Sequence, residues 1–145
     1  MENQKVSIAP LEVEVVYGEY PPNIDQIQAV FPMAMKDGVI FAYGRKVFVP
    51  SGRKIPPEIL AHERIHCERQ IDMGVEEWWT QYMADPVFRY HEELLAHRVE
   101  YSFLRGLYPG QDAKHRALEH VATKLAHPLY GGLVSKKRAK EDLKA

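Results

Sequence analysis

The alternation of apolar and polar residues near the start of the chain predicts a small sheet. Residues 11–17 place apolar side chains on one side and two glutamates on the other, which indicates a half-buried strand. Residues 39–43 and 46–49 are two further strand-like runs, separated only by Gly44 and Arg45. A glycine that leads a two-residue loop permits a type II′ turn, so these two runs are expected to form a hairpin.

Helical periodicity and helix-terminal residues predict five helices. Pro57 suits a first helical turn, Gly74 suits a helix end, and Asp85 followed by Pro86 is a cap before a first-turn proline. The helices are expected over residues 24–31, 57–73, 75–83, 86–105 and 111–126. The predicted fold is α+β, with helices 57–73 and 86–105 packed under a small twisted sheet.

The chain of 145 residues has the size of one domain, so we expect a single domain over residues 1–145. Trp78 and Trp79 are expected to pack in its interior, because such large rings bury much apolar area. Residues 135–145 are highly charged and nearly free of apolar periodicity. We therefore expect them to form a frayed, solvated end rather than a nucleic-acid arm.

Composition and charge exclude several classes of partner. Hydrophobic residues make up 46% and charged residues 27%, as in ordinary globular proteins, and the net charge of -1 gives no electrostatic reason to expect nucleic acid as a partner. Residues 1–5 lack a basic segment followed by an apolar run, and no stretch has the length of a membrane span. These features predict a soluble, cytoplasmic protein without a membrane partner.

The candidate chemistry lies in the predicted helix 57–73, where His62, Glu63 and His66 form the pattern H-E-x-x-H. Residues four apart lie one turn apart on the same helix face, so both imidazoles can converge on one metal ion with Glu63 beside it. Cys67, the single cysteine, points about 100° away from His66 around the helix. It is expected to be a small buried core residue rather than a metal ligand.

A catalytic zinc ion keeps three protein ligands and a water, so this motif needs a third Asp, Glu or His. The predicted helix 86–105 offers Glu92, Glu93 and His97 as candidates. The core side of this helix is expected along the apolar stripe Phe88, Leu95, Val99 and Phe103. An adjoining stripe consists of Glu93, Ala96, His97 and Glu100.

These two helices together resemble the gluzincins, zinc peptidases in which H-E-x-x-H is followed on a second helix by a glutamate ligand. In that class an alanine often stands three residues after the glutamate and a polar orienting residue four after it. Glu93, Ala96 and His97 match this arrangement. His97 stands where the class more usually has an aspartate, so it is expected either to orient a ligand histidine through a neutral ring nitrogen or to be a ligand itself.

The segment from Trp78 through Asp85, Arg89 and Glu93 also resembles small zincin-like proteins encoded by bacteriophages. The likeness covers about residues 39–101 and is carried by the two helices. It implies a minimal zincin-like domain with Zn2+ held by His62, His66 and Glu93.

The resemblance implies a peptidase that hydrolyses peptide bonds of a peptide or protein substrate through a zinc-activated water. Glu63 is expected to be the general base and later to protonate the leaving amine. An electrophile for the tetrahedral intermediate is sought among Tyr101, His127 and Tyr130. The substrate is expected to lie extended along an edge of the 39–49 hairpin.

Two other interpretations compete with the peptidase. The first is a zincin-like protein that binds zinc without turnover and has a structural or interaction role. The second is a metal-free helical domain in which H-E-x-x-H arises by chance. His115 and His120, on the last predicted helix, are expected at the surface under every interpretation.

Overall fold

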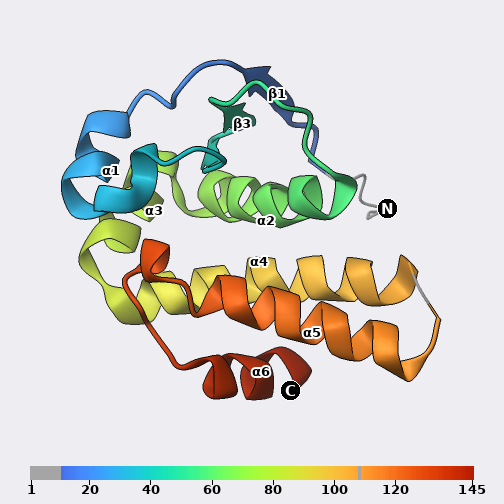
Figure 1. Cartoon of the computed structure of the whole chain (residues 1–145). Helices are drawn as coiled ribbons and strands as arrows, with labels where there is room; N and C mark the ends of the chain where they lie inside the picture. Colours follow the sequence, from blue (N-terminus) through green and yellow to red (C-terminus); the bar gives the residue numbers. More distant parts are fainter. Residues whose placement is uncertain (1–10, 108) are drawn as a thin grey trace, which may run out of the picture.

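A computed structural model describes residues 11–107 and 109–145 and has an α+β fold (Figure 1). The expectation that residues 1–5 contain no targeting segment concerns residues outside the described ranges. The elements are β1 (Glu14–Tyr17), α1 (Ile24–Val30), η2 (Pro32–Met35), β2 (Phe41–Tyr43), β3 (Lys46–Val49), α2 (Pro57–Met73), α3 (Val75–Ala84), α4 (Pro86–Leu107), α5 (Gln111–Leu125), η3 (Pro128–Tyr130) and α6 (Lys136–Lys144).

The three strands form one sheet in the order β1-β3-β2. β1 runs parallel to β3, and β2 is antiparallel to β3 through the predicted hairpin, with Tyr43 paired to Lys46. Gly44 has a φ of 64°. Arg45 has a negative φ, like every other non-glycine residue in the described ranges. This combination is that of the expected type II′ turn.

The elements are stacked in layers around α2. Figure 1 shows the strands on one side of α2 and the antiparallel pair α4 and α5 on the other, with α6 beyond them, and the contacts between these elements agree. α4 is the longest helix, with 22 residues. None of the helices in the described ranges is long and apolar enough to cross a membrane.

Gln70 holds α2 against the edge of the sheet. Its side-chain amide donates to the Ala42 carbonyl at 3.0 Å, and its Oε1 accepts from the Gly44 amide at 2.7 Å. Trp79 Nε1 also donates to the Ala42 carbonyl, at 3.2 Å. Because Gln70 lies one turn after His66 and two turns after His62, these bonds fix the rotation of the helix that carries the motif.

The apolar core contains the residues that the sequence places there. Trp78 and Trp79 are buried in a cluster with residues of α1, η2, β2 and β3, which confirms that they pack inside. Cys67 has no exposed area and packs beside Val47 and Val49, as expected of a small core residue.

The prediction of a frayed end over residues 135–145 is wrong. Residues 136–144 form α6, and the Ser135 side chain caps its first turn by accepting from the Arg138 amide at 3.1 Å. Ala139 and Leu143, four residues apart, are buried in a cluster with residues of α4 and α5. The buried apolar face of α6 consists of only these two side chains, one turn apart, so no apolar periodicity can be recognised in this highly charged segment.

The predicted core side of α4 is right only at Phe88, which packs against the cluster of Trp78 and Trp79. Phe103 is 37% exposed, and Leu95 and Val99 are only half-buried. The fully buried face is mainly polar and consists of Arg89, Glu92, Glu93, Ala96, His97, Glu100 and Tyr101. Charged groups tolerate such burial when they are paired and hydrogen-bonded, and most of these groups find their partners on α2 and α3.

Candidate metal and catalytic site

The carboxylate of Glu93 lies between the two histidines of the H-E-x-x-H motif. Its Oε1 is 3.6 Å from Nε2 of His62, and its Oε2 is 3.3 Å from Nε2 of His66. Glu63 flanks the same group, with Oε2 3.7 Å from Nε2 of His62. All four side chains are buried, so α2 and α4 together enclose two imidazoles and two carboxylates.

Glu92, the second candidate ligand on α4, faces a different set of partners. Its carboxylate receives two hydrogen bonds from the Arg69 guanidinium, at 3.1 and 2.8 Å, and one from Trp78 Nε1 at 2.8 Å. These donors occupy both of its oxygens. The structure therefore brings Glu93, and not Glu92, to the two histidines.

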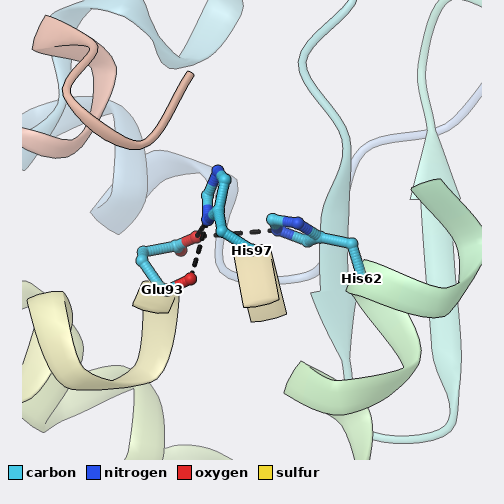
Figure 2. A group of neighbouring side chains, drawn as sticks. All are labelled: His62, Glu93 and His97. Carbon is cyan, nitrogen blue, oxygen red and sulfur yellow. Dashed lines mark hydrogen bonds and ion pairs between the residues drawn. The ribbon is translucent and has the colours of Figure 1, made fainter. Parts of the chain in front are cut away.

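His97 is turned toward the backbone of its own helix. Nδ1 lies 2.7 Å from the Glu93 carbonyl oxygen, and because a carbonyl can only accept, Nδ1 carries the ring proton. Figure 2 shows the other ring nitrogen pointing away from Glu93 and His62. That nitrogen, Nε2, is buried without a hydrogen-bond partner among the described residues.

One nitrogen of His97 nevertheless lies close to possible ligand atoms. His62, Glu93 and His97 each offer an atom within 4.8 Å of the others. Burial, and after it the charge on His62, lower the pKa of the His97 imidazole to about 3, so the ring stays neutral. Since its Nδ1 proton is engaged by the carbonyl, His97 offers no lone pair toward Glu93 in this arrangement.

Glu100 makes the contact to a motif histidine that the resemblance to gluzincins offered as one of two roles for His97. Its Oε1 lies 2.9 Å from Nδ1 of His62, and the Lys124 ammonium pairs with its other oxygen. Burial opposes the charge on Glu100, but His62 and Lys124 lower its carboxyl pKa to about 2. The expected role of His97 in orienting a ligand histidine is therefore taken by Glu100, three residues further along α4.

The hydrogen bond to Glu100 selects the tautomer of His62. An anionic carboxylate can only accept, so Nδ1 of His62 donates and its Nε2 faces Glu93. A metal-binding histidine commonly has this pattern, with one nitrogen held by a carboxylate and the other turned to the ion. Burial lowers the pKa of His62, but the hydrogen bonds to Glu100 and Glu93 act against it and raise the pKa to about 10.

Tyr82, on α3, supports the other end of the Glu93 carboxylate. Its hydroxyl donates to Oε2 of Glu93, and its ring stacks on Trp78 at 4.8 Å between centroids. Burial and the neighbouring Glu93 charge raise the pKa of Tyr82 well above its usual value, so the hydroxyl remains a donor. Sequence reasoning did not single out Tyr82, because contacts between helices are not visible in a linear pattern.

The donor set could hold a metal ion. Imidazole nitrogens and carboxylate oxygens are common ligands of divalent metals in proteins, zinc among them. In the described part of the chain, Glu93 Oε1 is buried without a hydrogen-bond partner. A buried carboxylate oxygen that faces an imidazole nitrogen without a hydrogen bond is an arrangement that a cation between them would stabilise.

Glu63 has the environment that a general base needs. Burial, the largest cause, and the nearby Glu93 raise the pKa of its carboxyl, although His62 and His66 act in the opposite direction. A raised pKa brings a carboxylate closer to neutral pH, where it can both accept and return a proton.

A cavity of about 580 Å³ opens beside these groups. Its lining includes His62, Glu63, His66 and Glu93, together with residues of α1, η2, β2, α3 and η3. This volume is within the usual range for ligand sites in proteins.

The three electrophile candidates differ in position. Tyr130 and His127 line the cavity, whereas Tyr101 is buried between α4 and α5, with Arg105 over its ring. The structure therefore does not bring Tyr101 to the site. His115 and His120 are exposed on α5, as expected.

Comparison with protein-family models, with curated proteins and with solved structures finds no match for this chain. What can be concluded about its function therefore depends on its own residues and their geometry.

Proposed function

We propose that the protein is a zinc-dependent peptidase of gluzincin-like type, built on a minimal zincin-like domain. His62, His66 and Glu93 would hold the metal, and Glu63 would act as the base. The observation that carries the proposal is the position of Glu93, whose two carboxylate oxygens lie 3.6 and 3.3 Å from the ε-nitrogens of the two motif histidines. A chance H-E-x-x-H would give no reason for a carboxylate from a distant helix to lie there.

When bound, zinc supplies a Lewis acid that polarises a substrate carbonyl and acidifies a water. The residues of the chain provide the rest of the chemistry. Glu63 takes a proton from the attacking water and returns it to the leaving amine, for which its raised pKa suits it. Glu100 and Tyr82 hold His62 and Glu93 in place, so that the ligands need little rearrangement.

A peptide substrate would lie along the free edge of β2. Ala42 uses its carbonyl at this edge to bind Gln70 and Trp79, so that part of the edge is closed. Ile40 lies just before β2, two residues before Ala42, so continued alternation would turn its backbone to the same outer side. Ile40 lines the same cavity as Glu63, which supports a substrate along this stretch of the edge.

The proposal is tested by metal analysis and hydrolysis with the same protein. We expect one zinc ion per chain after purification, and cleavage in a broad peptide library. Glu63→Gln keeps the shape of the side chain but cannot accept the proton, so the variant should keep its zinc and lose about 10²- to 10⁴-fold in rate. Equal cleavage by the wild type and the variant would reveal a contaminating protease.

A second candidate function is zinc binding without turnover. It is favoured by the closeness of His97, because a turn of its ring away from the Glu93 carbonyl would supply a fourth protein ligand and close the position that a catalytic site leaves open. His97→Ala separates the two functions. In the peptidase the variant should keep a full equivalent of zinc, and its Co2+ form should have an unchanged visible spectrum; in a closed site that spectrum would shift as a ligand is lost.

A further inference from the structure

We propose that the apolar part of the cavity is a binding site for one large apolar side chain of the substrate, either aromatic or branched aliphatic. This inference rests on the proposed peptidase function and adds a substrate class to it. The preference would apply to the residue that lies next to the hydrolysed bond, since one cavity contains both the apolar wall and Glu63.

Much of the apolar lining of the cavity comes from short elements and the segments next to them. η2 and η3 contact each other, although they are far apart in the sequence, and both contribute to the lining. Figure 1 shows η2, α1 and the segment after α5 at the same end of the molecule. The apolar side chains that line the cavity from this end, here called the apolar wall, are Ile27, Phe31, Met33, Ala34, Val39 and Leu129.

The charges around the cavity disfavour a charged occupant. Apart from the buried His and Glu group, the charged residues that line it are Lys36, Asp37 and Lys124. Lys36 and Asp37 are exposed, and Lys124 is paired with Glu100. A charged substrate side chain at the apolar wall would lose its hydration without gaining a buried partner, whereas an apolar one gains from each group that it buries.

The cavity is open to solvent and large enough to admit a side chain. Its volume of about 580 Å³ is within the usual range for ligand sites. Ile27 and Phe31 are buried in the core cluster and provide a firm base, while Met33 and Leu129 are only half-buried and can adapt to an occupant.

The first experiment measures binding rather than catalysis. Blocked tripeptide amides that differ only in the central residue, Ala, Leu, Phe, Lys or Asp, are titrated into the zinc-loaded Glu63→Gln protein by calorimetry. The Leu and Phe peptides should bind at least about tenfold more tightly than the Ala peptide, because they bury several more carbon atoms. The Lys and Asp peptides should bind no better than the Ala peptide.

Two methionines of η2 provide a matched pair of variants. Met33 lines the cavity, whereas Met35 is 39% exposed and lies outside it. Met33→Glu should abolish the preference for Leu and Phe and favour the Lys peptide, while Met35→Glu should leave the order of affinities unchanged. Leu129→Glu approaches the cavity from η3 and should repeat the Met33→Glu result if that variant fails to fold.

The outcomes separate the two proposals. Equal affinity for the Ala, Leu and Phe peptides, or the same order of affinities in both methionine variants, would overturn the apolar site even if Glu63-dependent cleavage is found. Selective binding without cleavage by the wild type would leave the apolar site standing and remove the peptidase.

Discussion

Glu100 and His62 are joined by a hydrogen bond of 2.9 Å between the carboxylate Oε1 and the ring Nδ1. The two residues belong to different helices, α4 and α2, and both are buried. This bond fixes the ring orientation and the tautomer of a histidine whose other nitrogen faces Glu93. Together with Glu93, Glu100 therefore links α4 to the motif on α2.

Replacement of Glu100 should weaken zinc binding without removing a ligand. We expect Glu100→Ala to lower zinc affinity by about 10- to 100-fold, as is typical when a ligand histidine loses its orienting carboxylate. The amide oxygen of Glu100→Gln can still accept from Nδ1, so the zinc affinity of this variant should lie between those of Glu100→Ala and the wild type. Glu119→Ala removes a carboxylate that pairs with Lys136 at the surface and serves as the control. Zinc competition with a chromophoric chelator measures all four proteins, and equal affinities would contradict this role.

Glu92 and Glu93 are neighbours in the sequence, and the structure gives them different partners. Glu93→Gln removes the negative charge between the two histidines and should lower zinc affinity by more than about 100-fold, beyond the effect of a residue that only orients a ligand. Glu92→Gln should keep the zinc and instead lower the melting temperature, because it weakens the charged hydrogen bonds from Arg69. Metal analysis and thermal unfolding of both variants decide the assignment, and the reverse result would make Glu92 the ligand.

Local signals in the sequence predicted the helices well. The helix 57–73 has the predicted bounds, since Pro57 and Gly74 act on the backbone next to them. Asp85 caps α4 by accepting from the Val87 amide at 2.9 Å, also as predicted.

The parts that the sequence could not supply depend on how the helices face one another. Glu100 stands in the same stripe as Glu93, two turns away, but only the packing of α4 against α2 shows that it reaches His62. The buried face of α4 is mainly polar, so apolar periodicity pointed to the wrong side of this helix. Periodicity predicts burial when the core is apolar, and it fails where a network of partnered charges is buried instead.

The C-terminal helix α6 should contribute to stability although its composition is highly charged. Leu143 is 4% exposed and packs against α5, so Leu143→Ala should destabilise the protein by about 2–5 kcal/mol. Lys137, exposed on the same helix, provides the matched control, and Lys137→Ala should change stability by less than about 0.5 kcal/mol. Urea unfolding measures both variants, and equal midpoints would mean that α6 does not pack on the domain in solution.

Under the proposed function, Tyr130 is a candidate to stabilise negative charge on a substrate carbonyl. It lies in η3, lines the same cavity as Glu63, and packs edge-on against His97 at 5.5 Å between ring centroids. Burial, and after it the charges of Glu93, Glu63 and Glu100, raise the pKa of Tyr130 well above its usual value. The Tyr130 hydroxyl therefore remains protonated near neutral pH and can donate a hydrogen bond.

Tyr130→Phe removes this single donor and keeps the ring in place. If the hydroxyl stabilises the developing oxyanion, kcat should fall by about 10²- to 10³-fold, while KM and zinc content change little, because the bond is made mainly in the transition state. His127 also lines the cavity, and because its Nδ1 accepts from the Leu129 amide at 3.0 Å, its Nε2 carries the proton of the neutral ring and can donate. His127 is exposed, however, and a donor in contact with water stabilises a charge less, so His127→Ala should have a smaller effect on kcat. Steady-state kinetics on the best peptide of the library measure both variants. A fall in kcat for His127→Ala but not for Tyr130→Phe would transfer the role to His127, and an increase in KM alone for Tyr130→Phe would show that Tyr130 only helps to bind the substrate.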